Sequence, residues 1–331
     1  MWRQIMKRVV ILAFDYVVAS TVTGPLDVFH QAGILWNYVC DAELTPFFKV
    51  SVATPDGRPI KCLGGISINP TYSMHEADSP DLIVISSVGN IQKTLGKHPE
   101  AVGWLRTHYD RGSSIASVCT GAFLLAETGL LDGKTATTHW GFTRLFNQRY
   151  PKVNLKPKRL ITDEGDLFCS GGVYSGVDLS IYLVEKHCGH ETAVQCSKAV
   201  IHDYVRESQA PYAVNLFQKD HKDKKILAVQ EYLENHYNSD KVDYNKLAEK
   251  FGLSRRTLIR RFKAATGDTP LLYLQRFRVE IAKVLIEKRH HTFDEIAYQV
   301  GYEDSGYFRK VFIQFTGLRP KEYQRKFTIT H

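Results

Sequence analysis

The sequence predicts an α/β domain, with a mostly parallel sheet sandwiched by helices, followed by an all-α domain. Three observations support this prediction. The length of 331 residues exceeds what one hydrophobic core usually organises. Up to residue 206, continuous apolar runs alternate with helical patterns. Beyond residue 223, the strand patterns vanish and helical periodicity continues to the end.

The apolar runs of the first part have the composition of parallel strands that are buried on both faces. Such strands contain consecutive Val, Ile and Leu because neither face meets water. The stretches between them place apolar residues at helical spacing. The expected strands are residues 9–14, 48–54, 82–85 and 114–118; the expected helices begin at Pro25 and cover residues 99–111 and 121–128.

Composition also places the domain boundaries. The alternating pattern defines an α/β domain over residues 1–206. Residues 207–223 are rich in polar and charged side chains and contain Pro211, so they are predicted to be a linker. Residues 224–331 are predicted to form the helical domain.

Positive charge is concentrated in the helical part of the chain. The net charge is +8, and residues 220–331 contain 22 Lys and Arg against 15 Asp and Glu. A compact basic domain joined to a nearly neutral one favours a polyanionic partner, with nucleic acid first. A solvated basic surface is the other interpretation of the charge alone.

The six cysteines are scattered, without C-x-x-C pairs or His at zinc spacing. We therefore expect reduced thiols in a cytoplasmic protein, with no metal and no cofactor. The apolar run after Lys7 and Arg8 is too short for a signal peptide and is interrupted by Asp15. No stretch reaches the ~18 apolar residues of a membrane helix, so we expect no membrane association.

The helical part contains a duplicated unit. Residues 254–267 align with residues 304–317, and the match extends to Pro270 with Pro320 and to Tyr273 with Tyr323. Each copy shows a helix, a short Gly turn and a second helix, at about residues 243–265 and 293–315. Thr269 and Pro270 open a connecting helix that runs to about Lys288. At ~1.5 Å per residue this helix spans about 30 Å, close to the ~34 Å of one DNA turn.

The second helix of each unit is expected to face outward with its polar side chains. Leu258 and Phe262 in the first copy, and Phe308 and Phe312 in the second, supply an apolar stripe at four-residue spacing. The remaining faces are cationic, which is the arrangement that enters a DNA major groove. The predicted DNA-binding residues are Arg255, Arg256, Thr257, Ile259, Arg260, Arg261, Ser305, Gly306, Tyr307, Arg309 and Lys310.

The segment GYEDSGYFRKVFIQFTGLRPKEYQR, residues 301–325, resembles the signature of the AraC/XylS transcriptional regulators. Residues 241–327 cover the whole DNA-binding domain of that family. The resemblance implies double-stranded DNA as the partner and outward second-helix positions that read base edges. These positions correspond to Arg256, Ile259 and Arg260 in the first unit and to Ser305, Gly306 and Lys310 in the second.

In the first domain, Cys119 lies where a predicted strand meets a helix, the position of a nucleophile elbow. Residues 7–206 resemble the class I glutamine amidotransferase-like (PfpI/ThiJ) domain, a flavodoxin-like fold. Joined to the C-terminal domain, they resemble the GlxA-type branch of AraC regulators. Thr120 stands where peptidase-like members have His, and residues 19–21 contain no supporting acid. We therefore expect no enzyme activity. A small apolar core residue for Cys119 and a hydrogen-bonded structural residue for His139 remain alternatives to a role in a pocket.

The resemblance implies that the former active-site cleft serves as an effector pocket at the carboxyl ends of the strands. The expected effector is a small nitrogenous metabolite, with Trp140 able to hold a cationic group. The expected function is a sequence-specific, effector-responsive activator of metabolic genes, acting as a homodimer and contacting RNA polymerase. A Cys119-dependent amidase or peptidase-like enzyme and a non-specific architectural DNA binder are the alternatives. The pocket candidates are Gly24, Pro25, Cys119, Thr120, His139, Trp140 and Gly172.

Overall fold

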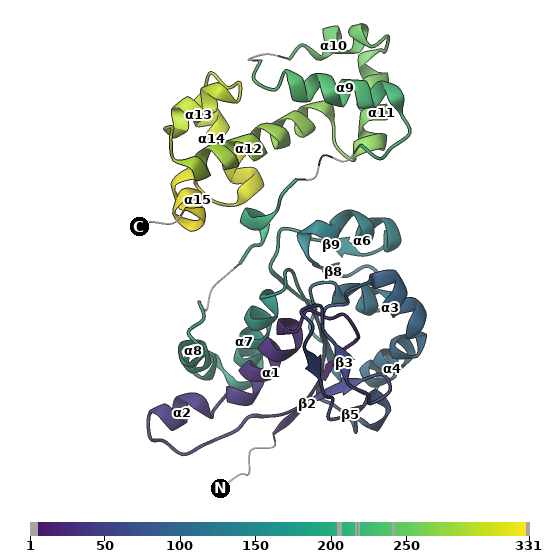
Figure 1. The fold of residues 1–331 in the computed structure, drawn as a ribbon, viewed down its shortest axis with the longest axis vertical. Coiled ribbons are helices and arrows are strands. Elements are labelled where there is room, and N and C mark those ends of the chain that lie inside the picture. Colours follow the sequence, from purple (N-terminus) through teal and green to yellow (C-terminus); the bar gives the residue numbers. More distant parts are fainter. Residues whose placement is uncertain (1–5, 204–206, 216, 218, 240–241, 329–331) are drawn as a thin grey trace. The chain divides into compact units, whose positions relative to one another are not determined.

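The computed structural model describes residues 6–203, 207–215, 217, 219–239 and 242–328. The chain forms two compact units, Met1–Gln209 and Ala210–His331, each with its own core (Figure 1). The first unit is α/β and the second is helical, as the sequence predicts. The division between them falls inside residues 207–223, the segment predicted to be a linker.

A seven-stranded sheet forms the centre of the described part of the first unit, in the order β10-β11-β7-β6-β1-β2-β5. Its pairs are parallel except for β10 with β11, which are antiparallel. The predicted strands at residues 48–54, 82–85 and 114–118 match the observed bounds. The strands are β1 (Lys7–Leu12), β2 (Phe48–Thr54), β5 (Tyr72–Ser73), β6 (Leu82–Ile85), β7 (Ser114–Val118), β10 (Ile161–Asp163) and β11 (Leu167–Ser170).

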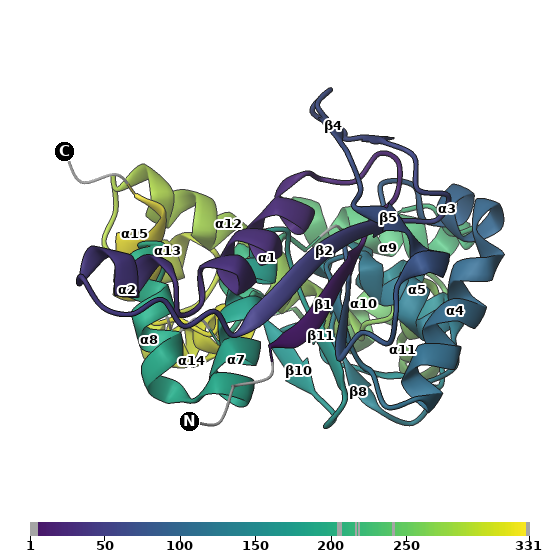
Figure 2. The same ribbon diagram turned by 90° about the horizontal axis from the view of Figure 1, so that it is seen from below.

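Helices cover both faces of this sheet (Figure 2). Successive residues of β1 point to opposite sides: Val9 and Ile11 belong to one core, and Val10 and Leu12 to the other. A strand that is covered on both sides needs no polar face, which explains its continuous apolar sequence. One face carries α1 (Ser20–Gln31), α7 (Ser175–Cys188) and α8 (His190–Ala199); the other carries α3 (Ile91–Lys97), α4 (Pro99–Asp110) and α5 (Gly121–Glu127).

Short elements complete the first unit around the edges of the sheet. Two small two-stranded sheets, β3–β4 and β8–β9, lie outside the main sheet in the described residues. The remaining elements are α2 (Leu35–Val39), β3 (Ile60–Lys61), β4 (Ser67–Ile68), η1 (Met74–Glu76), β8 (Thr135–Ala136), η2 (Trp140–Phe142), α6 (Thr143–Arg149) and β9 (Asn154–Leu155).

The second unit contains the duplicated helical motif that the repeat predicts. The hydroxyls of Thr266 and Thr316 each donate to the carbonyl four residues earlier, and Gly267 and Gly317 adopt positive φ angles that end the preceding helices. The elements are η3 (Ala210–Tyr212), α9 (Lys224–Asn235), α10 (Tyr244–Lys250), α11 (Arg255–Thr266), α12 (Pro270–Lys288), α13 (Phe293–Gln299), α14 (Ser305–Thr316) and α15 (Pro320–Phe327).

Part of the segment predicted to be a linker packs on the helical unit. The buried ammonium of Lys283 donates to the Ala213 carbonyl at 2.6 Å, and the Tyr212 ring meets Phe327 edge to face. The Phe217 ring packs against the rings of Tyr273 and Phe277 in the same unit. These contacts make Ala213, Tyr212 and Phe217 a structural part of the helical unit.

Arg278 in the middle of α12 connects the two copies of the motif. The residue is only 6% exposed. Its guanidinium donates to the carbonyls of Tyr237 at 2.6 Å and Ser239 at 2.7 Å, which lie between α9 and α10. On the second copy, the guanidinium lies 4.8 Å from the centre of the Tyr302 ring, next to the turn at Gly301. One buried cation thus joins the turn regions of both copies.

Replacing Arg278 by Ala should destabilise the helical unit by on the order of 3 kcal/mol, because the Tyr237 and Ser239 carbonyls lose a charged donor while buried. Amide hydrogen exchange of α12 in the full chain measures this loss. The matched control is Arg325→Ala, an exposed side chain with no partner among the described residues, which should change exchange by less than about 0.5 kcal/mol. Equal protection in both variants would contradict the bridging role of Arg278.

Candidate functional site

Helix α11 presents three arginines to solvent. Ser254 caps the helix by accepting from the Thr257 N–H at 3.2 Å, and Leu258 and Phe262 are fully buried. The buried stripe turns the opposite face outward, where Arg255, Arg256 and Arg260 are exposed. No hydrogen bond, ion pair or ring contact within the described part of the chain engages these three guanidinium groups.

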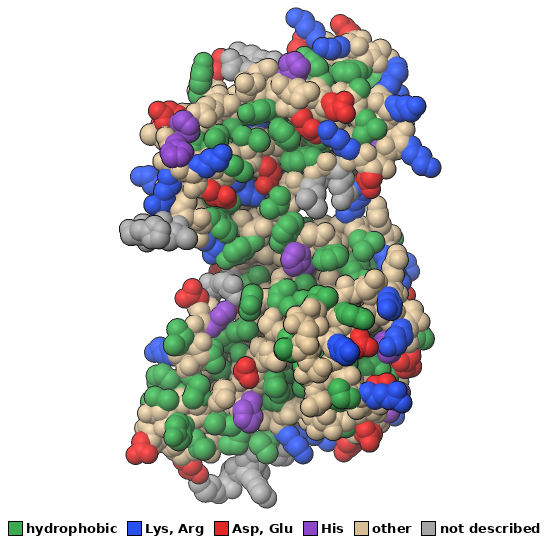
Figure 3. Space-filling view, in the orientation of Figure 1, with side chains coloured by type: hydrophobic (Ala, Val, Ile, Leu, Met, Phe, Trp, Pro, Cys, Tyr) green, Lys and Arg blue, Asp and Glu red, His purple; other side chains and the backbone are tan. Residues whose placement is uncertain are grey.

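An open hollow on this face is lined by Arg255, Arg256, Ile259 and Arg260. Ile259 is half-buried, so its apolar side chain lies among three cationic neighbours. Lys and Arg side chains stand along the edge of the helical unit that α11 occupies (Figure 3). The face therefore offers several unused donors and one methyl-bearing side chain to a ligand.

Arg261 on the same helix has a different environment. Its Nε and Nη2 atoms donate to the two carboxylate oxygens of Asp223 at 2.9 and 2.7 Å, and this pairing lowers the pKa of Asp223. Asp223 also caps α9 by accepting from the Ile226 N–H. Arg261 thus ties α9 to α11. The DNA contact that the sequence predicts for Arg261 would compete with this pair.

Helix α14 is the counterpart of α11, with fewer available cations. Its cap is Asp304, which accepts from the N–H groups of Gly306 and Tyr307. The Arg309 guanidinium lies 5.3 Å from the centre of the Phe293 ring and 3.8 Å from the Asp294 carboxylate. On the same helix, Ser305 is half-buried, the exposed Tyr307 hydroxyl accepts from Gln275, and Lys310 is exposed without a partner among the described residues. Thr257, a predicted contact on α11, is half-buried.

In the α/β unit, Cys119 occupies the turn between β7 and α5. Its φ angle is +59°, in the left-handed region that non-glycine residues adopt uncommonly. The Cys119 N–H donates to the Ser170 carbonyl, and its carbonyl accepts from the Thr138 hydroxyl. Burial raises the pKa of the Cys119 thiol to about 11, although hydrogen bonds with Thr120 oppose the rise. The thiol is therefore protonated at neutral pH.

The Thr120 hydroxyl is buried and bonded to the backbone of Val88. It accepts from the Val88 N–H and donates to the Val88 carbonyl, both at 2.9 Å. Beside it, the buried Thr21 hydroxyl lies 3.0 Å from the Ser87 hydroxyl. Neutral hydroxyls thus occupy the stretch at 19–21, where the sequence lacks the acid of the enzymes.

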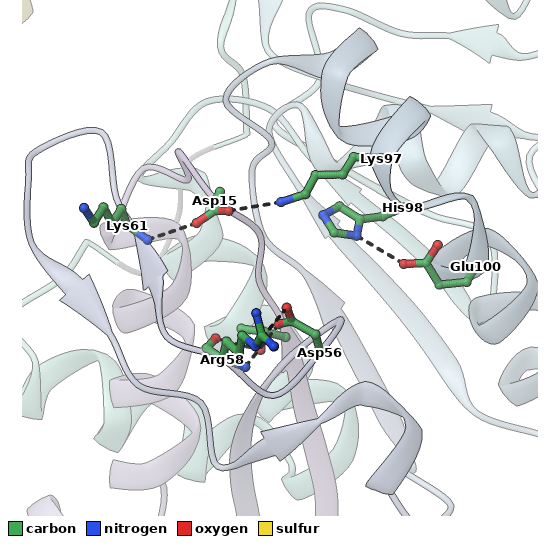
Figure 4. A network of polar contacts seen from close by, with 8 residues as sticks. Asp15, Asp56, Arg58, Lys61, Lys97, His98 and Glu100 are labelled. Carbon is green, nitrogen blue, oxygen red and sulfur yellow. Dashed lines mark hydrogen bonds and ion pairs between the residues drawn. The ribbon is translucent and has the colours of Figure 1, made fainter.

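Asp15, which follows β1, contacts Lys61 and Lys97 (Figure 4). Its carboxylate accepts from the Lys61 N–H at 3.2 Å and lies 3.5 Å from the Lys97 ammonium. In the same view, the His98 ring lies 3.1 Å from the Glu100 carboxylate. The two Asp15 contacts join the loop after β1 to Lys61 and Lys97, and they leave Asp15 engaged with a cation of its own. The His98–Glu100 contact is local.

The structure brings His139, Trp140 and Gly172 together. The His139 and Trp140 rings lie 5.1 Å apart, and a Cβ atom on Gly172 would lie 3.7 Å from His139 Cδ2. His139 Nδ1 accepts from the Gly141 N–H, and burial lowers the pKa of the imidazole, so His139 is neutral at pH 7. No hydrogen bond joins Cys119 to His139 within the described residues.

The remaining pocket candidates, Gly24 and Pro25, lie on α1 against α7. A Cβ atom on Gly24 would lie 3.0 Å from Val177 Cγ2, and Pro25 Cγ would lie 3.5 Å from a Cβ atom on Gly176. These close approaches explain the small residues at this helix pair. They are packing contacts, and nothing in them requires a ligand.

Gln209 is a buried polar residue of this region that sequence reasoning missed. The residue is 2% exposed, and its side-chain amide donates to the Thr138 carbonyl at 2.8 Å, with further bonds to Thr137 and Arg159. Its oxygen accepts from the Trp140 N–H at 3.3 Å. It lies in the predicted linker, where no periodic pattern marks a buried residue. Gln209 therefore fixes the loop that carries His139 and Trp140.

Comparison with known proteins identifies both units. Residues 247–326 match a helix-turn-helix domain, and residues 7–186, more than half of the chain, match the DJ-1/PfpI family. The chain belongs to the DJ-1/PfpI family. Its second unit is a helix-turn-helix domain of the AraC type, so this DJ-1/PfpI-type protein is a DNA-binding transcriptional regulator of the AraC family. The predicted fold class and family are confirmed.

Two similar regulators span most of the chain. The HTH-type transcriptional regulator GbdR of Pseudomonas aeruginosa is 26% identical over 291 residues, which cover 86% of this chain and 76% of GbdR. The HTH-type transcriptional regulator GlxA of Rhizobium meliloti is 26% identical over 287 residues, covering 85% of this chain and 86% of GlxA. The DJ-1/PfpI-type regulator thus resembles these proteins over both units.

The first unit alone also resembles an enzyme. Isonitrile hydratase of Pseudomonas putida is 27% identical over 183 residues, covering 55% of this chain and 72% of the hydratase. The DJ-1/PfpI-type unit therefore has relatives that regulate and relatives that catalyse. The described residues contain no group of three or more His, Cys, Asp or Glu side chains that could hold a metal ion. Among them, no helix is long and apolar enough to cross a bilayer.

The raised pKa of Cys119 predicts that this thiol of the DJ-1/PfpI-type regulator is alkylated slowly. At pH 8 iodoacetamide should modify the exposed Cys40 and leave Cys119 unmodified, because the thiolate is the nucleophile and forms only as the pH approaches about 11. Peptide mass spectrometry over a pH series measures both sites in one sample. Modification of Cys119 at the rate of Cys40 at pH 8 would show an activated thiol.

Proposed function

We propose that this chain is an effector-responsive regulator that reads a specific DNA sequence with α11 and α14 and activates metabolic genes. The observation that carries the proposal is the capped, outward face of α11 with three arginines that have no partner within the described residues. The 19-residue helix α12 spans about 28 Å at ~1.5 Å per residue, close to one DNA turn. Its length supports contacts in two successive major-groove segments.

We further propose that the loop with His139 and Trp140 forms an effector pocket for a small nitrogenous metabolite. The two rings are half-buried and the imidazole is neutral, so a cationic group placed over Trp140 would meet no like charge on His139. The linkage of this loop to Gln209 supports a regulatory use, because Gln209 directly precedes η3 of the DNA-binding unit. We also propose that the chain acts as a homodimer, because binding to paired half-sites multiplies affinity. A contact with RNA polymerase is the last part of the proposal.

A second candidate is a Cys119-dependent enzyme. The positive φ angle of Cys119 at a strand-to-helix turn favours it, because nucleophile elbows have this strained geometry. The protonated thiol, the absence of a bond to His139 in the described residues and the neutral Thr21 argue against it. Turnover of amides or isonitriles that Cys119→Ser abolishes would establish the enzyme.

Salt titration distinguishes a specific regulator from an architectural DNA binder. Binding should weaken steeply as salt rises, and Lys321→Ala, which removes an exposed cation, should reduce the slope of log affinity against log salt by about one on every duplex. At matched salt, duplexes selected from a random library should bind far more tightly than unselected ones. Equal affinity for all duplexes would favour the architectural binder.

A thermal-shift screen tests the pocket. Among amino acids, polyamines and betaines, at least one compound should raise the melting temperature of the full chain, because a ligand that binds the folded state stabilises it. Trp140→Ala should abolish the shift, whereas Tyr38→Ala, an aromatic residue of the same unit that is 74% exposed, should preserve it. An unchanged shift in Trp140→Ala would place the effector elsewhere.

A further inference from the structure

We infer that the two helix-turn-helix copies divide DNA recognition unequally: α11 reads the base sequence through guanine contacts, and α14 mainly holds the phosphate backbone. This inference rests on the proposed function and adds the division of work and the class of sequence. Its basis is a position-by-position comparison of the two helices, which the offset of the repeat makes possible.

Equivalent positions on the two helices carry different chemistry. Arg255 and Arg256 of α11 correspond to Ser305 and Gly306 of α14. Gly306 has no side chain, and its N–H is bonded to the Asp304 cap at 2.8 Å. The first turn of α11 therefore offers two guanidinium groups where α14 offers one hydroxyl.

The next turn shows the same asymmetry. Ile259 and Arg260 of α11 correspond to Arg309 and Lys310 of α14. The Arg309 guanidinium lies over the Phe293 ring and near Asp294, so it must leave both to reach a base. Lys310 is then the cation of α14 that has no partner in the described residues. It carries a compact charge that suits phosphate better than it discriminates bases.

The free arginines of α11 have the chemistry of guanine readers. A guanidinium fork donates two parallel hydrogen bonds to the O6 and N7 atoms of guanine, and Lys lacks this planar fork. Arg256 and Arg260 are four residues apart, so they share a face and are displaced by about 6 Å along the helix. That displacement corresponds to roughly two base pairs at ~3.4 Å each. It predicts two guanines about two base pairs apart.

Ile259 adds an apolar element to the same surface. It lines the hollow together with Arg256 and Arg260, and its side chain has no hydrogen-bonding group. The thymine methyl group is the apolar feature of the major groove. The sequence that fits α11 therefore combines two guanines with a neighbouring thymine, whereas the segment under α14 is weakly defined.

Selection of duplexes from a random library with the full chain tests the inference. The selected sequences should contain one well-defined segment with the two guanines and, about one DNA turn away, a weakly defined one. Arg256→Ala and Arg260→Ala should each weaken binding to the selected duplex by about ten- to a hundredfold. On a duplex in which adenine replaces both guanines, the wild type should also bind weakly. The affinities of the two variants for that duplex should then equal that of the wild type within a few-fold.

Two further variants separate base reading from charge. Arg256→Lys keeps the charge without the fork, so it should lose most of the preference for guanine over adenine while retaining the salt dependence. Lys310→Ala is the matched control on α14. It should weaken binding to the selected duplex and to the adenine-substituted duplex by the same factor, about fivefold or less.

The possible failures are distinguishable. A well-defined segment without guanine, or loss of discrimination in Lys310→Ala and not in Arg256→Ala, would overturn the division while leaving a sequence-specific regulator. The absence of any enriched sequence would overturn both the division and the proposed function.

Discussion

The buried guanidinium of Arg278 is the interaction on which the DNA-binding unit depends. Each helix-turn-helix copy is too small to hold a recognition helix rigidly, because its helices bury only a narrow apolar stripe. Arg278 lies on the helix that both copies share and binds carbonyls of one copy while it packs on an aromatic ring of the other. The Tyr237 side chain also belongs to both hydrophobic clusters. Rigid spacing of α11 and α14 follows from this shared centre.

The duplication extends beyond the residues that match in sequence. Tyr273 donates to Glu234 of α9 at 2.6 Å, and Tyr323 donates to Glu287 of α12 at 2.8 Å. The C-terminal part of α12 thus serves the second copy as α9 serves the first. The N-terminal part of α12 therefore packs in the first copy, and its C-terminal part packs in the second. This double use explains why the connecting helix is long, continuous and apolar on more than one side.

The sequence predicts those features whose cause is local. The runs at 48–54, 82–85 and 114–118 give the observed strands because strands buried on both faces must be apolar throughout. Thr269 and Pro270 mark the start of α12 because capping involves neighbouring residues. Contacts between distant residues leave no such pattern: Arg261 with Asp223, Lys283 with Ala213 and the burial of Gln209 emerge from the fold alone. The three residues of β10 are too few for a pattern to be read, and β11 ends in Cys169 and Ser170, which lack the β-branched or aromatic side chains typical of strands.

One physical cause, removal of water, sets the chemistry of the cleft in the first unit. Burial raises the pKa of the Cys119 thiol and lowers that of the His139 imidazole, so both groups are uncharged at neutral pH. A nucleophile needs the opposite outcome for Cys119, a thiolate held by a neighbouring cation or an oriented base. A binding pocket benefits from neutral walls, because a charged ligand then meets aromatic rings and hydroxyls rather than a fixed like charge. The strained turn at Cys119 can therefore persist as architecture, since it also positions the carbonyl that accepts from Thr138.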